Sequence, residues 1–191
     1  MINSLSNDCP ALCMLLSAAL VLAACASPNF ASTSPDRFDP QAVAWSKKIG
    51  RNTIAGRAEL TARSGEVKTC AGLEVRLVPD APYTRERIAM LYSTTGEGFV
   101  DAAAARRIQD RADAAVDPAY KRSHKVSTCD AKGRFAFSHL ADGSYFVLAP
   151  IVWRTRAGTA TDGGFLMRRV TAAGGQTIHL HLMPQTRISS R

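Results

Sequence analysis

The segment over residues 130–150, DAKGRFAFSHLADGSYFVLAP, constrains the fold more than any other part of this chain. Phe135 and Phe137 stand two residues apart, so a β-strand would present both aromatic rings on one face. A turn sequence at Gly143 follows, and from Tyr145 onward apolar side chains fill both faces of a second strand. The segment therefore predicts a β-hairpin whose aromatic side chains lie in the core of the protein.

The same residues allow a second interpretation, in which this hairpin is an RNA-binding platform. RNA-recognition modules stack the paired aromatic residues of a basic, glycine-containing octapeptide on unpaired bases. In that octapeptide the glycine directly precedes the first aromatic residue, whereas Arg134 separates Gly133 from Phe135 in this chain. We therefore expect Phe135 and Phe137 to be core residues, and we expect the protein to have no nucleic-acid partner.

The N-terminal residues resemble a bacterial lipoprotein signal. Residues 11–24, ALCMLLSAALVLAA, form an uncharged apolar run that is too short to span a bilayer comfortably but suits a secretory signal. The run ends in LAAC, which resembles the lipobox that precedes a lipid-modified cysteine. This resemblance implies a signal peptide over residues 1–24 and a lipid on the thiol of Cys25. The acyl chains would hold the protein on a membrane, at about 0.8 kcal/mol for each buried CH₂ group.

Two observations bear on this interpretation. The first ten residues, MINSLSNDCP, carry Asp8 and no Lys or Arg, whereas export signals normally begin with positive charge. The alternative is an uncleaved, buried hydrophobic segment. Ala26 follows the cysteine, at a place where an Asp would favour retention in the inner membrane of enteric bacteria. The lipoprotein interpretation therefore predicts a protein that is anchored in the outer membrane and faces the periplasm.

Length and charge limit the number of domains and the class of partner. The chain has 191 residues and a formal net charge of +8, from 24 Lys and Arg against 16 Asp and Glu. This length suits one domain with a real core, and the charge favours anionic partners such as phospholipid headgroups or acidic glycans. Residues 25–50 are rich in Ser, Pro and Ala and predict a flexible tether, with docking of Phe38 and Trp45 on the domain as the alternative.

The five cysteines separate into those of the signal and a pair in the domain. Cys9 and Cys13 would leave with the signal and Cys25 would carry the lipid, which leaves Cys70 and Cys129. An even pair in an oxidising compartment predicts a disulfide bond, which would stabilise the fold by roughly 4 kcal/mol. Two buried free thiols are one alternative. Metal or nucleophile chemistry is another, although neither a CxxC motif nor a patterned His accompanies the pair.

Strand patterns extend through most of the domain, which we place at residues 51–183 with a tail at residues 184–191. The stretch before Pro79 alternates apolar and polar residues, as a half-buried strand does. Further short apolar stretches are separated by glycine-containing turns, the last of them at Gly174-Gly175. Six or seven short strands in this arrangement predict a β-sandwich.

Residues 80–122 interrupt the strand pattern and read as an insertion. Good helix formers predict a helix over residues 100–116, which Asp101 would cap and Asp117-Pro118 would end. The apolar stripe of this helix is thin, so we expect the insertion to pack lightly on the sandwich. The alternative is that it forms a binding lobe over one end of the domain.

The residues of the hairpin resemble the carboxypeptidase regulatory-like domain family. Its pattern of Asp-x-x-Gly-x-Phe-x-Phe and then Leu-x-x-Gly-x-Tyr is matched by Asp130, Gly133, Phe135, Phe137, Leu140, Gly143 and Tyr145. The resemblance covers roughly residues 52–79 and 123–183. It implies a mainly β, seven-stranded, transthyretin-like or Ig-like sandwich, here with a partly helical insertion, in a family that is typically non-catalytic. Gly133 and Gly143 would supply the positive φ angles that tight turns require.

Candidate catalytic or metal-binding residues are few. His179 and His181 share one face of a strand and could begin a metal site, but no third ligand can be named, and a solvated strand face is the interpretation we favour. The sequence contains no GxSxG, HExxH, SxxK or Walker motif. We therefore expect no catalytic residue, no metal, no cofactor and no enzymatic activity.

Two classes of function remain open. The first is a non-catalytic, lipid-anchored envelope module that binds an envelope protein, the cell wall or another anionic envelope component. The second is a ligand-binding or hydrolytic protein that acts on envelope glycans or peptides. Basic stretches at residues 106–107, 121–125 and 168–169 suit anionic partners in either class. A cleft with convergent polar groups near the insertion would favour the second class, and a filled sandwich without such a cleft would favour the first.

Overall fold

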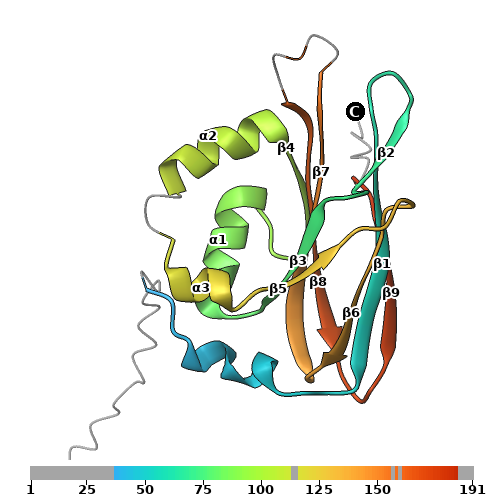
Figure 1. Cartoon of the computed structure of the whole chain (residues 1–191). Helices are drawn as coiled ribbons and strands as arrows, with labels where there is room; N and C mark the ends of the chain where they lie inside the picture. The colour runs from blue at the N-terminus through green and yellow to red at the C-terminus, as the bar shows by residue number, and fades with distance from the viewer. Residues whose placement is uncertain (1–36, 113–115, 156–157, 159–160, 185–191) are drawn as a thin grey trace, which may run out of the picture. The chain divides into compact units, whose positions relative to one another are not determined.

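The structure is a computed structural model, and it describes residues 37–112, 116–155, 158 and 161–184 (Figure 1). Within these residues nine strands form two sheets, so the predicted mainly β class is confirmed and the arrangement is that of a β-sandwich. The expected number of seven strands is wrong. Two strands escape recognition in the sequence because β2 has only three residues and β4 lies inside the expected helical insertion.

The first sheet has four strands and is centred on β1 (Asn52–Thr61). The neighbours of β1 are β6 (Arg134–Leu140) and β2 (Val67–Thr69), which pair with it antiparallel, and β9 (Thr177–Leu182), which pairs with it parallel. The parallel pairing puts the last strand of the domain beside the first. The two ends of the sandwich sequence therefore close against each other in one sheet.

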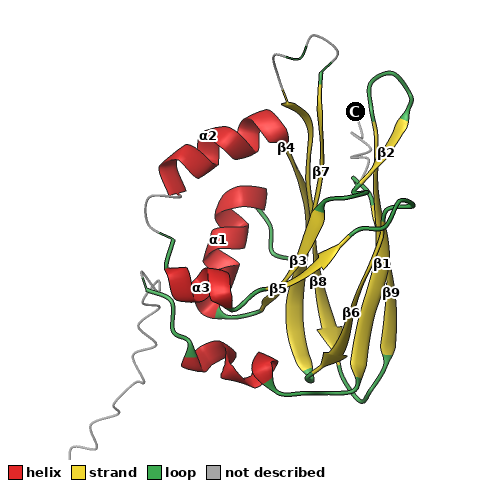
Figure 2. Cartoon of the chain, in the orientation of Figure 1, coloured by secondary structure: helices red, strands yellow, loops and turns green. Residues whose placement is uncertain are grey.

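The second sheet has five strands, and every neighbouring pair is antiparallel. Its order is β4 (Glu97–Asp101), β8 (Thr161–Ala172), β7 (Gly143–Arg154), β3 (Glu74–Pro79) and β5 (Lys125–Thr128). One face of this sheet packs on the first sheet, and the helices lie over the other face (Figure 2). The five-stranded sheet is thus the middle layer of the domain.

The sandwich core lies between the two sheets and is built by alternation along the strands. In β7, Tyr145 and Val147 face the first sheet, whereas Phe146 between them faces the helices. Phe135 and Phe137 of β6 lie in the sandwich core, 4% and 5% exposed, with ring centroids 6.1 Å apart. The predicted β-hairpin is wrong, because β6 pairs with β1 in the four-stranded sheet whereas β7 pairs with β3 and β8 in the five-stranded sheet. The chain crosses from one sheet to the other between these two strands, and each strand contributes aromatic side chains to the core between the sheets.

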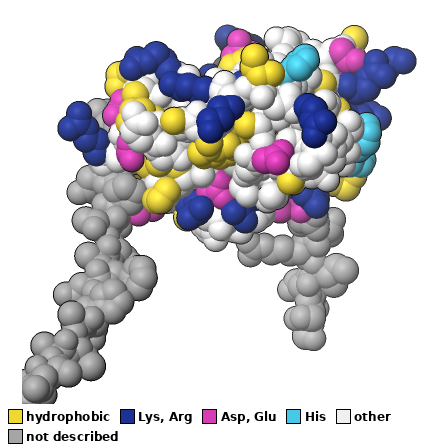
Figure 3. Space-filling model, turned by 90° about the horizontal axis from the view of Figure 1, so that it is seen from below, with side chains coloured by type: hydrophobic (Ala, Val, Ile, Leu, Met, Phe, Trp, Pro, Cys, Tyr) yellow, Lys and Arg dark blue, Asp and Glu magenta, His cyan; other side chains and the backbone are white. Residues whose placement is uncertain are grey.

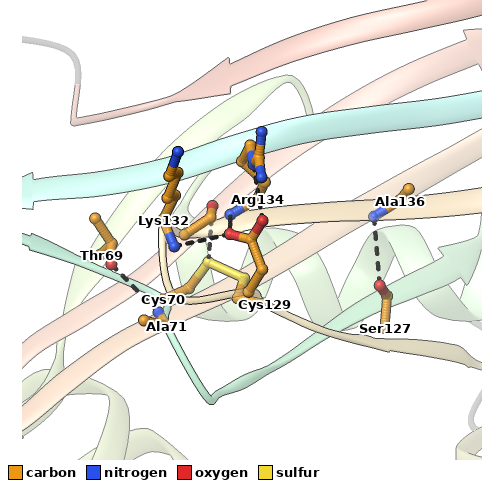
Figure 4. The surroundings of a disulfide bond; sticks show 10 residues. Thr69, Cys70, Ala71, Ser127, Cys129, Lys132, Arg134 and Ala136 are labelled. Carbon is orange, nitrogen blue, oxygen red and sulfur yellow. Dashed lines mark hydrogen bonds and ion pairs between the residues drawn. A yellow bond between two sulfur atoms is a disulfide. The ribbon is translucent and has the colours of Figure 1, made fainter.

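The turns that lead into β6 and β7 require glycine. The backbone φ angle is 72° at Gly133 and 149° at Gly143, and residues other than glycine rarely adopt such positive φ angles. At Gly143 a Cβ would also lie 2.2 Å from the indole ring of Trp45. At Gly133 the turn is held by Asp130, whose carboxylate accepts the backbone N–H of Arg134 at 2.9 Å (Figure 4).

A disulfide bond joins Cys70 to Cys129, with a Cα–Cα distance of 5.7 Å, and this confirms the predicted pairing (Figure 4). Cys70 lies on the connection from β2 to β3, and Cys129 lies on the connection from β5 to β6. Both connections cross from one sheet to the other, so the bond fastens the two crossovers together. Beside it, the N–H of Cys129 donates to the carbonyl of Leu73 at 2.9 Å.

The insertion folds into α1 (Pro82–Tyr92), β4, α2 (Ala102–Ala112) and α3 (Pro118–Arg122). Its helices cover the outer face of the five-stranded sheet, on the side away from β1 and β9 (Figure 1). In the part of the chain that the structure describes, no helix is long and apolar enough to cross a membrane.

The helix expected over residues 100–116 corresponds to α2. Asp101 caps it as predicted, because its carboxylate accepts the backbone N–H three residues later at 2.8 Å. Asp117 begins the next helix, since its carboxylate accepts the N–H of Ala119 at 2.7 Å. Residues 113–115, over which the expected end of the first helix falls, lie outside the described residues. Pro118 suits the first position of α3, where its missing N–H has no intrahelical partner to lose.

The insertion packs closely on the sheet, contrary to the expectation of light packing. Phe38, Tyr83 and Tyr120 meet edge to face, with ring centroids 5.6, 5.5 and 5.1 Å apart. Beneath these rings lie the buried side chains of Phe146 and Met167, which point outward from the sheet. The domain therefore has a second hydrophobic core, which we call the outer core, between the sheet and the insertion.

The expected tether over residues 25–50 is too long at its C-terminal end. Residues 41–47 form a short 3₁₀ helix, and Phe38 and Val43 are only 3% and 1% exposed. Trp45 packs its ring on Tyr145, with centroids 5.0 Å apart. Residues 37–50 therefore belong to the folded domain, because their few large apolar side chains find buried positions on it.

A buried carboxylate attaches the start of the insertion to the sheet. The side chain of Asp80 is 2% exposed and accepts from Arg85 Nε at 2.6 Å and from Arg169 Nε at 2.7 Å. Arg85 belongs to α1 and Arg169 to β8. Because two guanidinium groups pair with it, the charge of Asp80 is compensated where water is largely excluded.

Candidate functional site

A cavity of about 520 Å³ lies between the outer face of the five-stranded sheet and the insertion. Its sheet side is formed by Glu74, Arg76, Leu148, Pro150 and Phe165. Its insertion side is formed by Arg87, Ile88, Leu91, Tyr92, Val100, Ala105, Val116, Tyr120 and Lys121. His124 and the backbone beside the disulfide, at Gly72 and Leu73, complete the lining. Apolar and aromatic walls with a few polar groups are typical of ligand sites.

Two arginines from different elements face this cavity. Arg76 lies in β3 between Val75 and Leu77, which are buried in the sandwich core, so alternation directs Arg76 to the opposite face. Arg87 comes from α1, and its guanidinium carbon lies 5.7 Å from the ring centroid of Tyr83 and 5.8 Å from that of Tyr120. These cation–π contacts orient the guanidinium group from the insertion side.

His124 stands beside the two arginines and carries an unpaired nitrogen. Its Nε2 is buried and has no hydrogen-bond partner among the described residues. Its ring packs edge-on against Tyr120, with centroids 4.5 Å apart. Burial first, and the charges of Arg76 and Arg87 second, together lower the pKa of His124 to about 4. His124 is therefore neutral at physiological pH and can offer Nε2 to a ligand.

The tyrosines of the cavity are also held in their neutral form. Burial raises the pKa of Tyr120 to about 12, although the nearby charge of Arg87 opposes this shift. Burial also raises the pKa of Tyr92, to which Tyr120 adds a smaller contribution. Both hydroxyl groups therefore remain protonated and can donate hydrogen bonds near neutral pH.

The histidines of the last strand do not form a metal site with the residues described. His179 and His181 lie on the exposed face of β9, and His181 Nε2 pairs with Glu59 Oε1 at 2.8 Å. Within residues 37–112, 116–155, 158 and 161–184, no group of three metal-ligating side chains comes together. Cys25 falls outside the described residues.

The three basic stretches of the sequence differ in their position and in whether their charges are paired. Arg168 and Arg169 are paired with Glu97 and Asp80 respectively, so they are compensated within the fold. Residues 106–107 are exposed on α2, and residues 121–125 contribute Lys121 and His124 to the cavity. On the face drawn in Figure 3, Lys and Arg lie at separate positions with Asp and Glu among them. The net positive charge is thus spread over that face.

Sequence reasoning missed most of the cavity. Arg76, Arg87, Tyr92 and Tyr120 were not singled out, because they lie on three separate elements. One signal was present: Arg76 occupies an outward position of a strand that an insertion directly follows. A charged residue there must lie beneath the insertion if the insertion folds back on the sheet.

Comparison with known proteins supports the mainly β fold. No protein-family model matches the chain, and no curated protein matches it. The chain is similar to the crystal structure of a candidate carbohydrate-binding protein from Pseudomonas aeruginosa, with 28% sequence identity and a TM-score of 0.61. This match covers 76% of the present chain and 97% of that chain. A minor pilin of Streptococcus agalactiae has 15% identity and a TM-score of 0.32 over 77% and 49% of the respective chains, which is too weak to carry an argument.

Proposed function

We propose that this protein is a lipid-anchored, non-catalytic binding module of the bacterial cell envelope, and that it binds a carbohydrate in the cavity between the five-stranded sheet and the insertion. The observation that carries this proposal is the cavity itself. Its volume of about 520 Å³ falls within the range of small-molecule sites, roughly 300–1,000 Å³. Of the two classes left open by the sequence, such a cleft favours a ligand-binding protein.

The lining of the cavity suits a sugar ring. Tyr92 and Leu148 offer apolar surface to the C–H face of a ring, while tyrosine hydroxyl groups, guanidinium groups and His124 Nε2 offer hydrogen bonds to its hydroxyl groups. The similarity to a candidate carbohydrate-binding protein, over 97% of that chain, supports the same class of ligand.

The proposal excludes hydrolysis of the bound carbohydrate. Most glycoside hydrolases place two carboxyl groups on either side of the bond that they cleave. Among the described residues that line the cavity, Glu74 alone carries a carboxyl group. His124, with a pKa of about 4, is a weak base at neutral pH. Incubation with envelope oligosaccharides, followed by mass spectrometry, should detect no cleavage products, and their appearance would contradict this part of the proposal.

A cavity-filling variant tests the location of the binding site. Leu91 and Met90 are neighbours on α1, but Leu91 lines the cavity whereas Met90 is 59% exposed and is not part of the lining. We expect Leu91→Trp to abolish binding to an array of envelope oligosaccharides, and Met90→Trp to leave it unchanged. Equal binding by the two variants would place the carbohydrate site elsewhere, and no binding by the unmodified protein would refute the carbohydrate function.

The anchor is supported by the LAAC sequence at Cys25 and is tested separately. Cys25→Ser should release the protein from the membrane fraction or block its maturation, because no thiol remains to carry the lipid. Fractionation of bacteria that express the variant measures this outcome. Mature Cys25→Ser protein in the outer-membrane fraction, at the level of the unmodified protein, would contradict the lipid anchor.

A further inference from the structure

The five arginines of β3, β8 and α1 fall into two groups. Arg85, Arg168 and Arg169 each pair with a carboxylate at 2.6 to 3.3 Å. Arg76 and Arg87 pair with no carboxylate of the described residues, although both face the cavity. The fold therefore compensates the guanidinium groups that hold the insertion in place, and within the described residues it provides no carboxylate for the two cavity guanidinium groups.

Building on the carbohydrate function proposed above, we infer that the ligand is an acidic saccharide, and that its carboxylate is bound between Arg76 and Arg87. The two side chains approach the cavity from opposite layers, Arg76 from the sheet and Arg87 from the insertion. A carboxylate between them accepts charge-assisted hydrogen bonds from both guanidinium groups, an arrangement that the planar geometry of arginine favours.

The remaining charged groups of the cavity are consistent with this assignment. Lys121 adds a third positive charge at the edge, and Glu74 supplies the one negative charge of the described lining. The lining therefore keeps a net positive charge that an anionic ligand would reduce. His124 is neutral, and its unpaired Nε2 can donate or accept a hydrogen bond to a sugar hydroxyl group beside the carboxylate.

Arg87 is already oriented in the protein without a ligand. Arg87 is fixed over the rings of Tyr83 and Tyr120, at 5.7 and 5.8 Å. The backbone of Arg76 is fixed in β3, which pairs with β5 on one side and β7 on the other. A cation that is already oriented loses less conformational freedom when a ligand binds, so the preference for an acidic sugar costs little ordering entropy.

A matched pair of sugars tests the inference. Methyl α-D-galacturonide and methyl α-D-galactoside differ only in whether the sixth carbon is a carboxylate, and calorimetric or NMR titration of the purified protein gives both dissociation constants. We expect the galacturonide to bind about tenfold more tightly, and we expect added NaCl to weaken its binding selectively. Arg76→Gln should remove most of the difference. Arg63→Gln, an equal change of charge on the exposed turn between β1 and β2, should leave it intact.

Each other outcome has a distinct meaning. Equal binding of the two sugars would overturn the acidic-ligand inference and leave the carbohydrate function standing. If neither sugar binds, a titration with sodium acetate, followed through the ¹⁵N-labelled side chains of Arg76 and Arg87, decides the rest. Acetate-induced shifts that Arg76→Gln abolishes would support the anion site and refute the carbohydrate function. No response to acetate would overturn both.

Discussion

The two faces of the five-stranded sheet are built from the same strands but have opposite character. The inner face belongs to a closed core of aliphatic and aromatic side chains, with a disulfide bond among them. The outer face carries the outer core and, beside it, a cavity that contains arginine, histidine and tyrosine. Alternation in β3 and β7 assigns each residue to one face or the other. The inner face therefore stabilises the domain, and the outer face is free to carry a binding site.

Equal truncations on the two faces should have unequal costs. Phe137→Ala removes a ring that is 5% exposed in the sandwich core, and we expect it to lower the free energy of unfolding by about 3–5 kcal/mol. Phe165→Ala removes a half-buried ring from the cavity wall, where a void already exists, and should cost about 1–2 kcal/mol. Denaturant unfolding measures both values. Equal costs would show that the two faces are packed alike.

Removal of the disulfide bond tests how much the stability of the sandwich core depends on the link between the β2–β3 and β5–β6 connections. The bond links residues 59 positions apart, and replacement of Cys70 and Cys129 by Ala should lower the free energy of unfolding by about 2–5 kcal/mol. The unmodified protein under reducing conditions should show the same loss, and the double variant should not respond to the reductant. A double variant as stable as the oxidised protein would show that the disulfide bond does not contribute to the free energy of unfolding.

Acidification should act on the outer face through His124. Its folded-state pKa is about 4 against 6.5 for the unfolded chain, so the unfolded chain binds this proton more readily. His124 therefore makes the free energy of unfolding fall as pH decreases from 6.5 to 4, by at most about 3 kcal/mol. His124→Gln should flatten this part of the pH profile, whereas His179→Gln, on the exposed face of β9, should not. Identical profiles for the two variants would refute the burial argument.

Loss of a buried charge should loosen the insertion more than it affects the core. Asp80→Asn leaves Arg85 and Arg169 with a weaker acceptor, but their side chains are 50% and 41% exposed, so water limits the cost to about 1–2 kcal/mol. Hydrogen exchange should become faster in α1 and remain unchanged in β6. Glu66→Gln breaks an exposed pair with Lys68 and should change stability by less than about 0.5 kcal/mol. Faster exchange in β6 would show that the two layers are coupled.

Local sequence patterns were sufficient to place β6, β7 and the turns before them, but not to show that these two strands lie in different sheets. Phe135, Gly133 and Gly143 are set by alternation and by turn geometry, both of which operate over a few residues. The helix cap at Asp101 is local for the same reason. The disulfide bond joins distant residues, yet it could be predicted because only one pair of cysteines remained after the signal was assigned.

The parts that the sequence did not reveal depend on distant contacts. Phe38 is buried because Tyr83 and Tyr120, far along the chain, form a surface that receives it. A flexible tether and a docked segment can have the same composition, so the composition of residues 25–50 could not show that part of this segment docks on the domain. Arg76 and Arg87 are likewise brought together only when the insertion folds back over β3. Tertiary packing therefore determines the cavity, whereas local pattern determines the sandwich.

The docking of residues 37–50 has a mechanical consequence. Any tension that reaches the domain along the chain before residue 37 acts first on Phe38, whose ring contacts Tyr83 of α1 and Tyr120 of α3. The same two helices line the cavity. A pull that extracts Phe38 would remove packing from beneath Arg87 and Tyr120 before it loads any strand of the sandwich. The contact that first resists tension on the N-terminal segment and the wall of the cavity thus share the ring of Tyr120.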